Sequence, residues 1–523
     1  MKNQKRILRC GDGLCPFFLI GSLTATLFIF SVLSSCSEGF GKTVTFKPDL
    51  LHWSQFRGPN ASGIAPEDSD PPIHFNADTN LLWQTEILPG WSSPCIVDEK
   101  IFLTGFCDTD SVLCTMAINR KNGEFIWKDT VSPAGYFELH PISGYANPSV
   151  TSNGERVFSY FPSFGLIAHD LYGNRCWTYE LGQVGETKWA AASSPVVVDS
   201  MVLMSVSDYF DPKLIAIDCE SGEPQWIIKG GDHSLGFVMG RSTPVVWNNL
   251  VIMHHFQEII AYNPFSGKPE WWIPLPTSGI GTPVIQDSVL FVNTWVNSGE
   301  RSQGYTQMSF EELVSQKDIN GNMKIERSEL TDEFKIFQRP EIADLPETSA
   351  KMNQESFFSN FDEDGDGAFV ESEWNAMCES LEGAMQEHGM VAISLNGQGE
   401  RSATDILWKV IEDTPETPSP LLIGQHVMFI KNGGIVTVIE QNTGEVEHKE
   451  RIGAPGCYLA SPMLAGNRIY TCSFNGTVTV LSADDFSVLA HNRLREKIGA
   501  SPVTADDVLY IRTEKHLFAF REI

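Results

Sequence analysis

Oxygen-bearing side chains recur at regular intervals between residues 362 and 373. Carboxylates occupy positions one, three, five and twelve of this stretch, and the backbone carbonyl of position seven is a further ligand. In chain order these are Asp362, Asp364, Asp366, Ala368 and Glu373. A calcium ion takes about six to eight hard oxygen ligands at such intervals. Gly367 stands at position six, where the chain turns through a conformation that favours glycine. The spacing therefore predicts a calcium site.

This stretch, called loop two, resembles the calcium loop of EF-hand proteins, and a second copy lies upstream at residues 318–329. The predicted ligands of this loop one are Asp318, Asn320, Asn322, the carbonyl of Lys324, and Glu329. Met323 replaces the favoured glycine and two amides replace carboxylates, so we expect loop two to fill first. Phe361 and Trp374 are expected to help build an apolar surface or core beside the loops. The alternative for each loop is a solvated acidic segment without an ion.

The overall charge indicates which partners the chain does not bind. The chain has 523 residues, 42% of them hydrophobic, and a formal net charge of −29. A nucleic acid backbone is bound through clustered lysine and arginine side chains, so the acidic balance argues against nucleic acid as a partner.

The N-terminus has the pattern of an export signal. Basic residues between Lys2 and Arg9 precede an apolar run over residues 16–32, and small residues lead to Cys36. This arrangement resembles a bacterial lipobox, which implies lipid on Cys36 and a membrane-tethered protein. We therefore expect an exported bacterial lipoprotein at the outer membrane, in the periplasm or on the cell surface. An uncleaved signal anchor and simple secretion are the alternatives.

Eight of the eleven cysteines follow Cys36. An even number in an oxidising compartment permits disulfides, although spacing does not give their connectivity. Cys107 and Cys114 flank a short polar turn and are placed to pair across a hairpin. Closely spaced cysteines of the zinc-binding kind are absent from the sequence, so a zinc site is not expected.

A unit recurs roughly every 40 to 50 residues from about residue 80 onward. It opens with a small residue and a proline, and continues through apolar strands and polar turns. The openings are Ser93-Pro94, Asn147-Pro148, Ser194-Pro195, Thr243-Pro244, Thr282-Pro283, Ser419-Pro420, Ser461-Pro462 and Ser501-Pro502. Their number predicts eight blades.

The second half of the unit is sharper in the first four repeats, where an Asp or Asn precedes a glycine and a tryptophan. The tryptophans are Trp127, Trp177, Trp226 and Trp271. These repeats resemble the PQQ-type β-propeller repeats of quinoprotein dehydrogenases and of the lipoprotein subunit of the outer-membrane β-barrel assembly machine. The resemblance implies an all-β, eight-bladed propeller in which tryptophans pack between blades.

Five regions follow from this pattern. We expect a lipoprotein-type signal at 1–36, an N-terminal lead-in at 37–79, propeller blades at 80–299 and 391–523, and a small all-α EF-hand pair inserted in blade five at 300–390. The strand at residues 80–85 is expected to complete the last blade and close the ring, which removes exposed sheet edges.

The resemblance also raises the question of an enzyme. In PQQ-dependent dehydrogenases the quinone lies in the central funnel beside a disulfide between adjacent cysteines. This sequence has no adjacent cysteines and no haem-binding Cys-x-x-Cys-His motif, so PQQ is not expected. His254 and His255 are consecutive on a predicted strand and therefore face opposite ways. No catalytic residue is assigned.

We therefore expect a calcium-binding, membrane-anchored propeller that acts as a binding or scaffolding module. Its partner on a propeller face would be a protein, a peptide or a polysaccharide. A PQQ-dependent oxidoreductase and an outer-membrane protein assembly factor are the alternatives.

Overall fold

The structure is a computed structural model that describes residues 53–136, 139–140, 142–182, 192–208, 211–230, 240–295, 308–330 and 362–522. The predicted signal segment, the predicted lipidation site Cys36, residues 37–52 and Phe361 lie outside the described residues.

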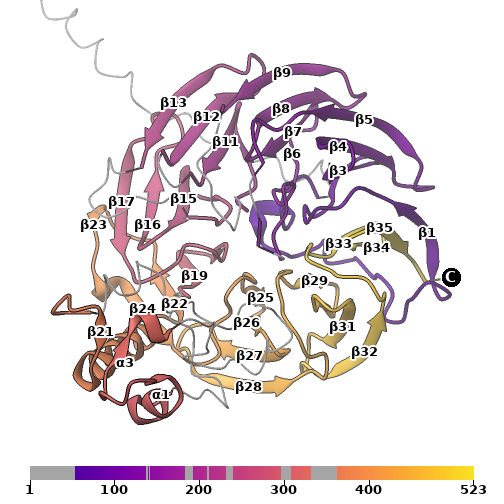
Figure 1. Cartoon of the computed structure of the whole chain (residues 1–523). Helices are drawn as coiled ribbons and strands as arrows, with labels where there is room; N and C mark the ends of the chain where they lie inside the picture. The colour runs from indigo at the N-terminus through magenta and orange to yellow at the C-terminus, as the bar shows by residue number, and fades with distance from the viewer. Residues whose placement is uncertain are drawn as a thin grey trace, which may run out of the picture. The chain divides into compact units, whose positions relative to one another are not determined.

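Eight sheets follow one another around a ring, and each sheet is one blade with four antiparallel strands, to which blade 4 adds a fifth, parallel strand (Figure 1). The first strand of a blade is short, and most of its residues are buried. Blades 1 to 4 contain β2 (Cys95–Val97), β3 (Lys100–Cys107), β4 (Val112–Asn119) and β5 (Phe125–Val131); β6 (Thr151–Ser152), β7 (Arg156–Phe161), β8 (Gly165–Asp170) and β9 (Arg175–Glu180); β10 (Val196–Val198), β11 (Met201–Val206), β12 (Lys213–Asp218) and β13 (Pro224–Lys229); and β14 (Val245–Trp247), β15 (Leu250–His255), β16 (Glu258–Tyr262) and β17 (Pro269–Pro274).

Blades 5 to 8 repeat the pattern with two departures, one in blade 5 and one in blade 8. They contain β18 (Val284–Gln286), β19 (Val289–Asn293), β22 (Met390–Ser394) and β24 (Ile406–Val410); β25 (Leu421–Ile423), β26 (His426–Lys431), β27 (Ile435–Glu440) and β28 (Val446–Arg451); β29 (Met463–Ala465), β30 (Arg468–Cys472), β31 (Thr477–Ser482) and β32 (Val488–Arg493); and β33 (Val503–Ala505), β34 (Val508–Arg512), β35 (His516–Phe520) and β1 (Leu81–Glu86). In blade 5 the neighbouring strands β19 and β22 are separated by residues 294–389.

Blade 8 joins the two ends of the ring. Strand β1 pairs antiparallel with β35, with Leu81 opposite Phe520 and Glu86 opposite His516. The predicted all-β, eight-bladed propeller is confirmed, including its closure by the strand predicted at residues 80–85.

A closed ring of hydrogen bonds links the eight blades just before their first strands. In each blade a backbone N–H donates to the hydroxyl of the equivalent residue in the next blade, with donor to acceptor distances of 2.8 to 3.2 Å. The members are Ser93, Ser149, Ser194, Thr243, Thr282, Ser419, Ser461 and Ser501. The last N–H, from Ser501, donates to Ser93 at 3.0 Å.

The ring of hydrogen bonds places the opening of blade 2 at a different residue from the predicted one. In blade 2 the hydroxyl comes from Ser149, which follows Pro148, whereas in the other blades the hydroxyl residue precedes its proline. The predicted opening at Asn147 is therefore wrong by two positions. Side-chain chemistry, rather than the position of the proline, marks the equivalent residue.

We expect the substitution Ser461→Ala to destabilise the propeller. The buried N–H of Ser419 would lose its acceptor at 3.0 Å, and an unsatisfied buried donor costs about 1–3 kcal/mol. Chemical denaturation followed by tryptophan fluorescence measures the loss. Ser461→Thr is the matched control, because threonine fills the same role at two other ring positions. An alanine variant as stable as the threonine variant would contradict a stabilising role for the ring.

The tryptophans of the outer strands dock onto the next blade. The indole N–H groups of Trp127, Trp177 and Trp226 donate to backbone carbonyls of the following blade at 3.3, 3.0 and 2.7 Å. A Cβ added at Gly173 would lie 2.6 Å from the ring of Trp127, so the turn can approach only without a side chain. The predicted packing between blades is confirmed for these three tryptophans.

Trp271 in blade 4 is covered differently. A fifth, parallel strand, β23 (Gly399–Glu400), pairs with β17 beside Trp271 and is followed by the 3-10 turn η5 (Ala403–Asp405). The guanidinium carbon of Arg401 lies 4.9 Å from the centre of the Trp271 ring. A cation thus lies over the indole of Trp271, where glycines contact Trp127, Trp177 and Trp226. Trp271 also packs with Leu290 and Val292 of blade 5, so its predicted packing between blades is confirmed.

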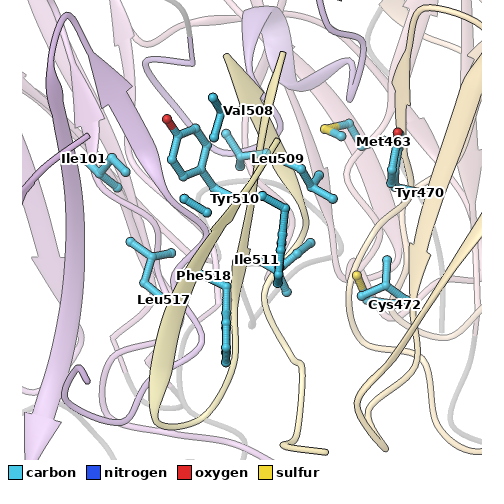
Figure 2. Close-up of a cluster of buried hydrophobic side chains, with 14 of the residues drawn as sticks. Ile101, Met463, Tyr470, Cys472, Val508, Leu509, Tyr510, Ile511, Leu517 and Phe518 are labelled. Atoms are coloured by element: carbon cyan, nitrogen blue, oxygen red, sulfur yellow. The ribbon is translucent and has the colours of Figure 1, made fainter. Parts of the chain in front are cut away.

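The largest apolar cluster runs through blades 7, 8 and 1. Figure 2 shows Tyr510, Leu517 and Phe518 of blade 8 with Tyr470 of blade 7 and Ile101 of blade 1. The two chain ends meet in this cluster, because β1 and β35 belong to the same blade. Its burial stabilises the closure of the ring.

The lead-in between Trp53 and Ala65 contacts the first strands of several blades. It includes the 3-10 turn η2 (Pro59–Ala61). Its hydrogen-bond partners are Ile96 in blade 1, Ser152 in blade 2, Val246 in blade 4, Pro420 just before β25 of blade 6 and Leu464 in blade 7. The segment therefore ties together strands that lie far apart in the sequence.

Cys107 and Cys114 are both free thiols. Strands β3 and β4 pair Cys107 with Val112 and Cys114 with Gly105, so the two sulfurs sit on diagonal rather than directly opposed positions. The predicted pairing of Cys107 with Cys114 is not formed.

In the part of the chain that the structure describes, no helix has both the length and the apolar character needed to cross a membrane.

Candidate metal centre

The candidate metal ligands lie in the segment that separates β19 and β22 of blade 5. Its described parts are α1 (Phe310–Lys317), β20 (Ile325–Glu326), the 3-10 turn η3 (Arg327–Glu329), β21 (Ala368–Phe369) and α3 (Glu371–Glu387). Helix α1 begins at an N-cap serine, Ser309, whose hydroxyl accepts from the N–H of Glu312 at 3.1 Å.

A small apolar core holds these elements together. Phe310 and Leu313 of α1 pack with Trp374 and Met377 of α3, and Ile325 and Phe369 of the two short strands complete it. The indole N–H of Trp374 donates to the carbonyl of Met308 at 3.1 Å. Trp374 thus contributes to the core rather than to an exposed surface.

Loop two brings three predicted ligands together. Carboxylate oxygens of Asp362, Asp364 and Glu373 all lie within 4.8 Å of one another. Among the described residues this is the only group of three or more His, Cys, Asp or Glu side chains so arranged. Backbone N–H groups orient two of them: Asp362 accepts from Gly367 at 2.8 Å, and Glu373 accepts from Val370 at 3.0 Å.

Loop one repeats this hydrogen-bond pattern with its own residues. Asp318 accepts from the N–H of Met323 at 2.9 Å, and Glu329 accepts from Ile319 at 2.9 Å and from Glu326 at 2.9 Å. The first and last ligand positions are thus oriented alike in the two loops, although the three-carboxylate cluster occurs in loop two.

Position six is left-handed in both loops. Gly367 has φ +81° and Met323 has φ +62°. Glycine adopts this conformation at little cost, whereas an unbranched side chain such as methionine is disfavoured there. The Met323 side chain is 65% exposed, so no packing compensates the strain.

The two loops are joined back to back by a two-stranded antiparallel ladder. Ile325 pairs with Phe369, and Glu326 pairs with Ala368. Both apolar residues of this ladder are fully buried in the small core. The ladder therefore fixes the backbone of one loop against that of the other.

Lys324 connects the loops by a contact that sequence reasoning missed. Its Nζ lies 2.7 Å from Oδ2 of Asp366. This hydrogen bond raises the pKa of the Lys324 ammonium and lowers the pKa of the Asp366 carboxyl. Only the carbonyl of Lys324 was assigned from sequence. The available signal was a lysine directly before the short strand of loop one that pairs with loop two.

The donor set fits a hard divalent cation. The predicted side-chain ligands of both loops offer only carboxylate and amide oxygens, the type that calcium prefers, and no soft sulfur ligand or imidazole stands among them. The ammonium on Asp366 shows that the loop two carboxylates already attract a cationic group.

The histidine pair of blade 4 does not form a second centre. His254 contacts the carbonyl of Gly281 at 2.8 Å and the hydroxyl of Thr277 at 2.6 Å, whereas His255 contacts Tyr262 at 3.0 Å. The rings point away from each other, as predicted for adjacent residues of a strand.

Comparison with known proteins gives a family model and several solved structures. The model described as outer membrane protein assembly factor BamB matches residues 115–255 and 215–312. BamB from Moraxella catarrhalis is 11% identical, with 84% of this chain and 98% of that chain covered and a TM-score of 0.48. A europium-containing methanol dehydrogenase is 10% identical, with 90% and 98% covered and a TM-score of 0.53.

No curated protein matches the sequence. At such low identities the similar structures speak for the fold alone, and the family model adds a match to the repeats themselves. The eight blades make the chain a β-propeller protein, and residues 115–312 match the PQQ-like repeats of this family model.

Proposed function

We propose that the chain binds calcium through an EF-hand pair and that the propeller serves as a binding or scaffolding module. The convergence of the Asp362, Asp364 and Glu373 carboxylates within 4.8 Å carries the proposal. Three like charges at this distance repel one another, and a divalent cation between them relieves the repulsion. Acidic loops that bind no ion have no reason to repeat the same hydrogen-bond pattern on both sides of a shared ladder.

In loop two the ion would be held by Asp362, Asp364, Asp366, the carbonyl of Ala368 and Glu373. In loop one it would be held by Asp318, Asn320, Asn322, the carbonyl of Lys324 and Glu329. Calcium neutralises the acidic ligands and fixes the loops on which α1 and α3 stand. Since fewer charged ligands and a strained Met323 weaken loop one, loop two binds more tightly.

Calorimetric titration of the full-length protein in detergent, after removal of calcium with a chelator, tests this proposal. We expect a tighter event from loop two and a weaker one from loop one, with a higher thermal midpoint in calcium because the ion binds only the folded loops. Magnesium at the same concentration is the control, since its smaller, octahedral coordination suits these loops less well. The absence of both heat and thermal shift with calcium would contradict the proposal.

We further propose that the protein is exported and tethered to a membrane through lipid on Cys36. In an extracellular compartment calcium is abundant, so weak sites suffice and a structural role is favoured over a switch. The partner on the propeller face would be a protein, a peptide or a polysaccharide.

The family-model match favours a second candidate, an outer-membrane protein assembly factor. This candidate is compatible with calcium binding, because the match covers residues 115–312 and the calcium loops lie after them. Co-purification with an outer-membrane barrel complex supports this role, and its absence under mild solubilisation argues against it.

A further inference from the structure

We propose that the side chain of Lys324 is a built-in competitor that sets the calcium affinity of loop two. The inference rests on the proposed calcium binding and deepens it. Lys324 belongs to loop one, yet its ammonium contacts Oδ2 of Asp366, the fifth-position ligand of loop two, at 2.7 Å.

The pairing of the two loops holds Lys324 close to Asp366. Lys324 directly precedes Ile325, and Asp366 lies three residues before the paired Phe369. The N–H of Arg327 also donates to the carbonyl of Gly367 at 3.2 Å, which holds the second loop against the first. The ladder and this hydrogen bond therefore keep the backbone of Lys324 within reach of Asp366.

The ammonium lies in the field of the whole loop two site. Its pKa is raised first by the hydrogen bond to Asp366 and further by the charges of Asp364 and Glu373. Both side chains of the pair remain partly open to solvent, at 42% and 35% exposure, so a cation entering from water can reach the carboxylate.

Calcium binding in loop two is then an exchange of cations on Asp366. The ion must either displace the ammonium, which breaks the ion pair, or share the carboxylate with it, which places two positive charges close together. Lysine therefore lowers the affinity while it relieves carboxylate repulsion in the calcium-free loop. Because both partners are exposed, the effect is modest and is screened by salt.

The experiment compares calcium titrations of the full-length protein with Lys324, Lys324→Met and Lys324→Arg. All three carry Glu329→Gln, which removes the twelfth ligand of loop one so that the heat reports on loop two. At low ionic strength we expect Lys324→Met to bind about two- to fivefold more tightly, the equivalent of one exposed ion pair. The gain should shrink at high salt, and Lys324→Arg should resemble the native residue.

Lys268→Met is the matched control for net charge. Lys268 is exposed in the turn before β17, so its loss changes the total charge equally without touching the loops. Equal or weaker binding by Lys324→Met overturns this inference and leaves calcium binding intact. An equal gain of calcium affinity in Lys268→Met also overturns this inference, because the change in total charge would then explain the result. No calcium heat from the unsubstituted protein overturns the proposed function as well.

Discussion

The double substitution Asp362→Ala with Glu373→Ala is expected to remove the tighter calcium-binding event. It deletes the first and twelfth ligands of loop two, which supply two of the three clustered carboxylates. Loss of even an outer-shell partner of a metal site lowers affinity about 10- to 100-fold, and ligands contribute at least as much. In calorimetry the loop two heat should vanish, and the weaker heat of loop one should remain.

Glu363→Ala with Glu371→Ala is the matched control. These residues occupy the second and tenth positions of loop two, carry the same total charge and are exposed. The N–H of Glu363 still donates to Glu373 at 2.9 Å after substitution, because that contact uses the backbone. Native affinity in the Asp362 and Glu373 variant would place the calcium elsewhere, in loop one or in the propeller. An equal loss of calcium affinity in both double variants would mean that the effect comes from the total negative charge of the loop and not from the two ligands.

Much of the fold could be predicted because the repeat unit carries its own chemistry. Each unit has a hydroxyl beside a proline, then apolar strands, and in several blades a glycine and a tryptophan. These residues recur because each contacts the neighbouring blade. The closure of the ring was also predictable, because a blade one strand short at the C-terminus needs a strand from elsewhere, and residues 80–85 supply it.

Contacts between segments far apart in the sequence were not predictable. Arg57 donates to the carbonyl of Pro420, and Arg401 stacks on Trp271, although neither pair shares a motif or a spacing rule. The same holds for the site. The ligand positions of the loops follow from local spacing, whereas the ion pair of Lys324 with Asp366 depends on how the two loops face each other.

The opening of blade 2 shows a different kind of failure. The repeated role belongs to the hydroxyl that accepts from the neighbouring blade, and the proline does not mark its position in every blade. Ser149 follows its proline instead of preceding it. The proline therefore predicts the wrong residue for the opening of blade 2, whereas the hydrogen bond identifies Ser149. A search for hydroxyls at the repeat period would have found the complete ring.

Trp53→Ala is expected to produce the largest loss of stability among single substitutions discussed for this chain. Trp53 lies outside the repeats, yet it is only 1% exposed and packs in the apolar cluster that spans blades 7, 8 and 1. Its backbone N–H donates to the carbonyl of Ile96 at 3.2 Å and its carbonyl accepts from Ile96 at 2.9 Å. Gly58 turns back over the indole with φ +68°, where an added Cβ would lie 3.0 Å from the ring.

Truncation of such a tryptophan leaves a large cavity, and substitutions of this kind cost about 3–5 kcal/mol. Because the lead-in also bonds to blades 2, 4, 6 and 7, the neighbouring backbone is held in place and cannot collapse to fill the space. Chemical denaturation should therefore show a clear fall in the unfolding midpoint. Tyr172→Ala, at a side chain that is 79% exposed, is the control and should change the unfolding free energy by about 0.5 kcal/mol or less. A Trp53 variant as stable as this control would mean that the lead-in rests on the propeller without stabilising it.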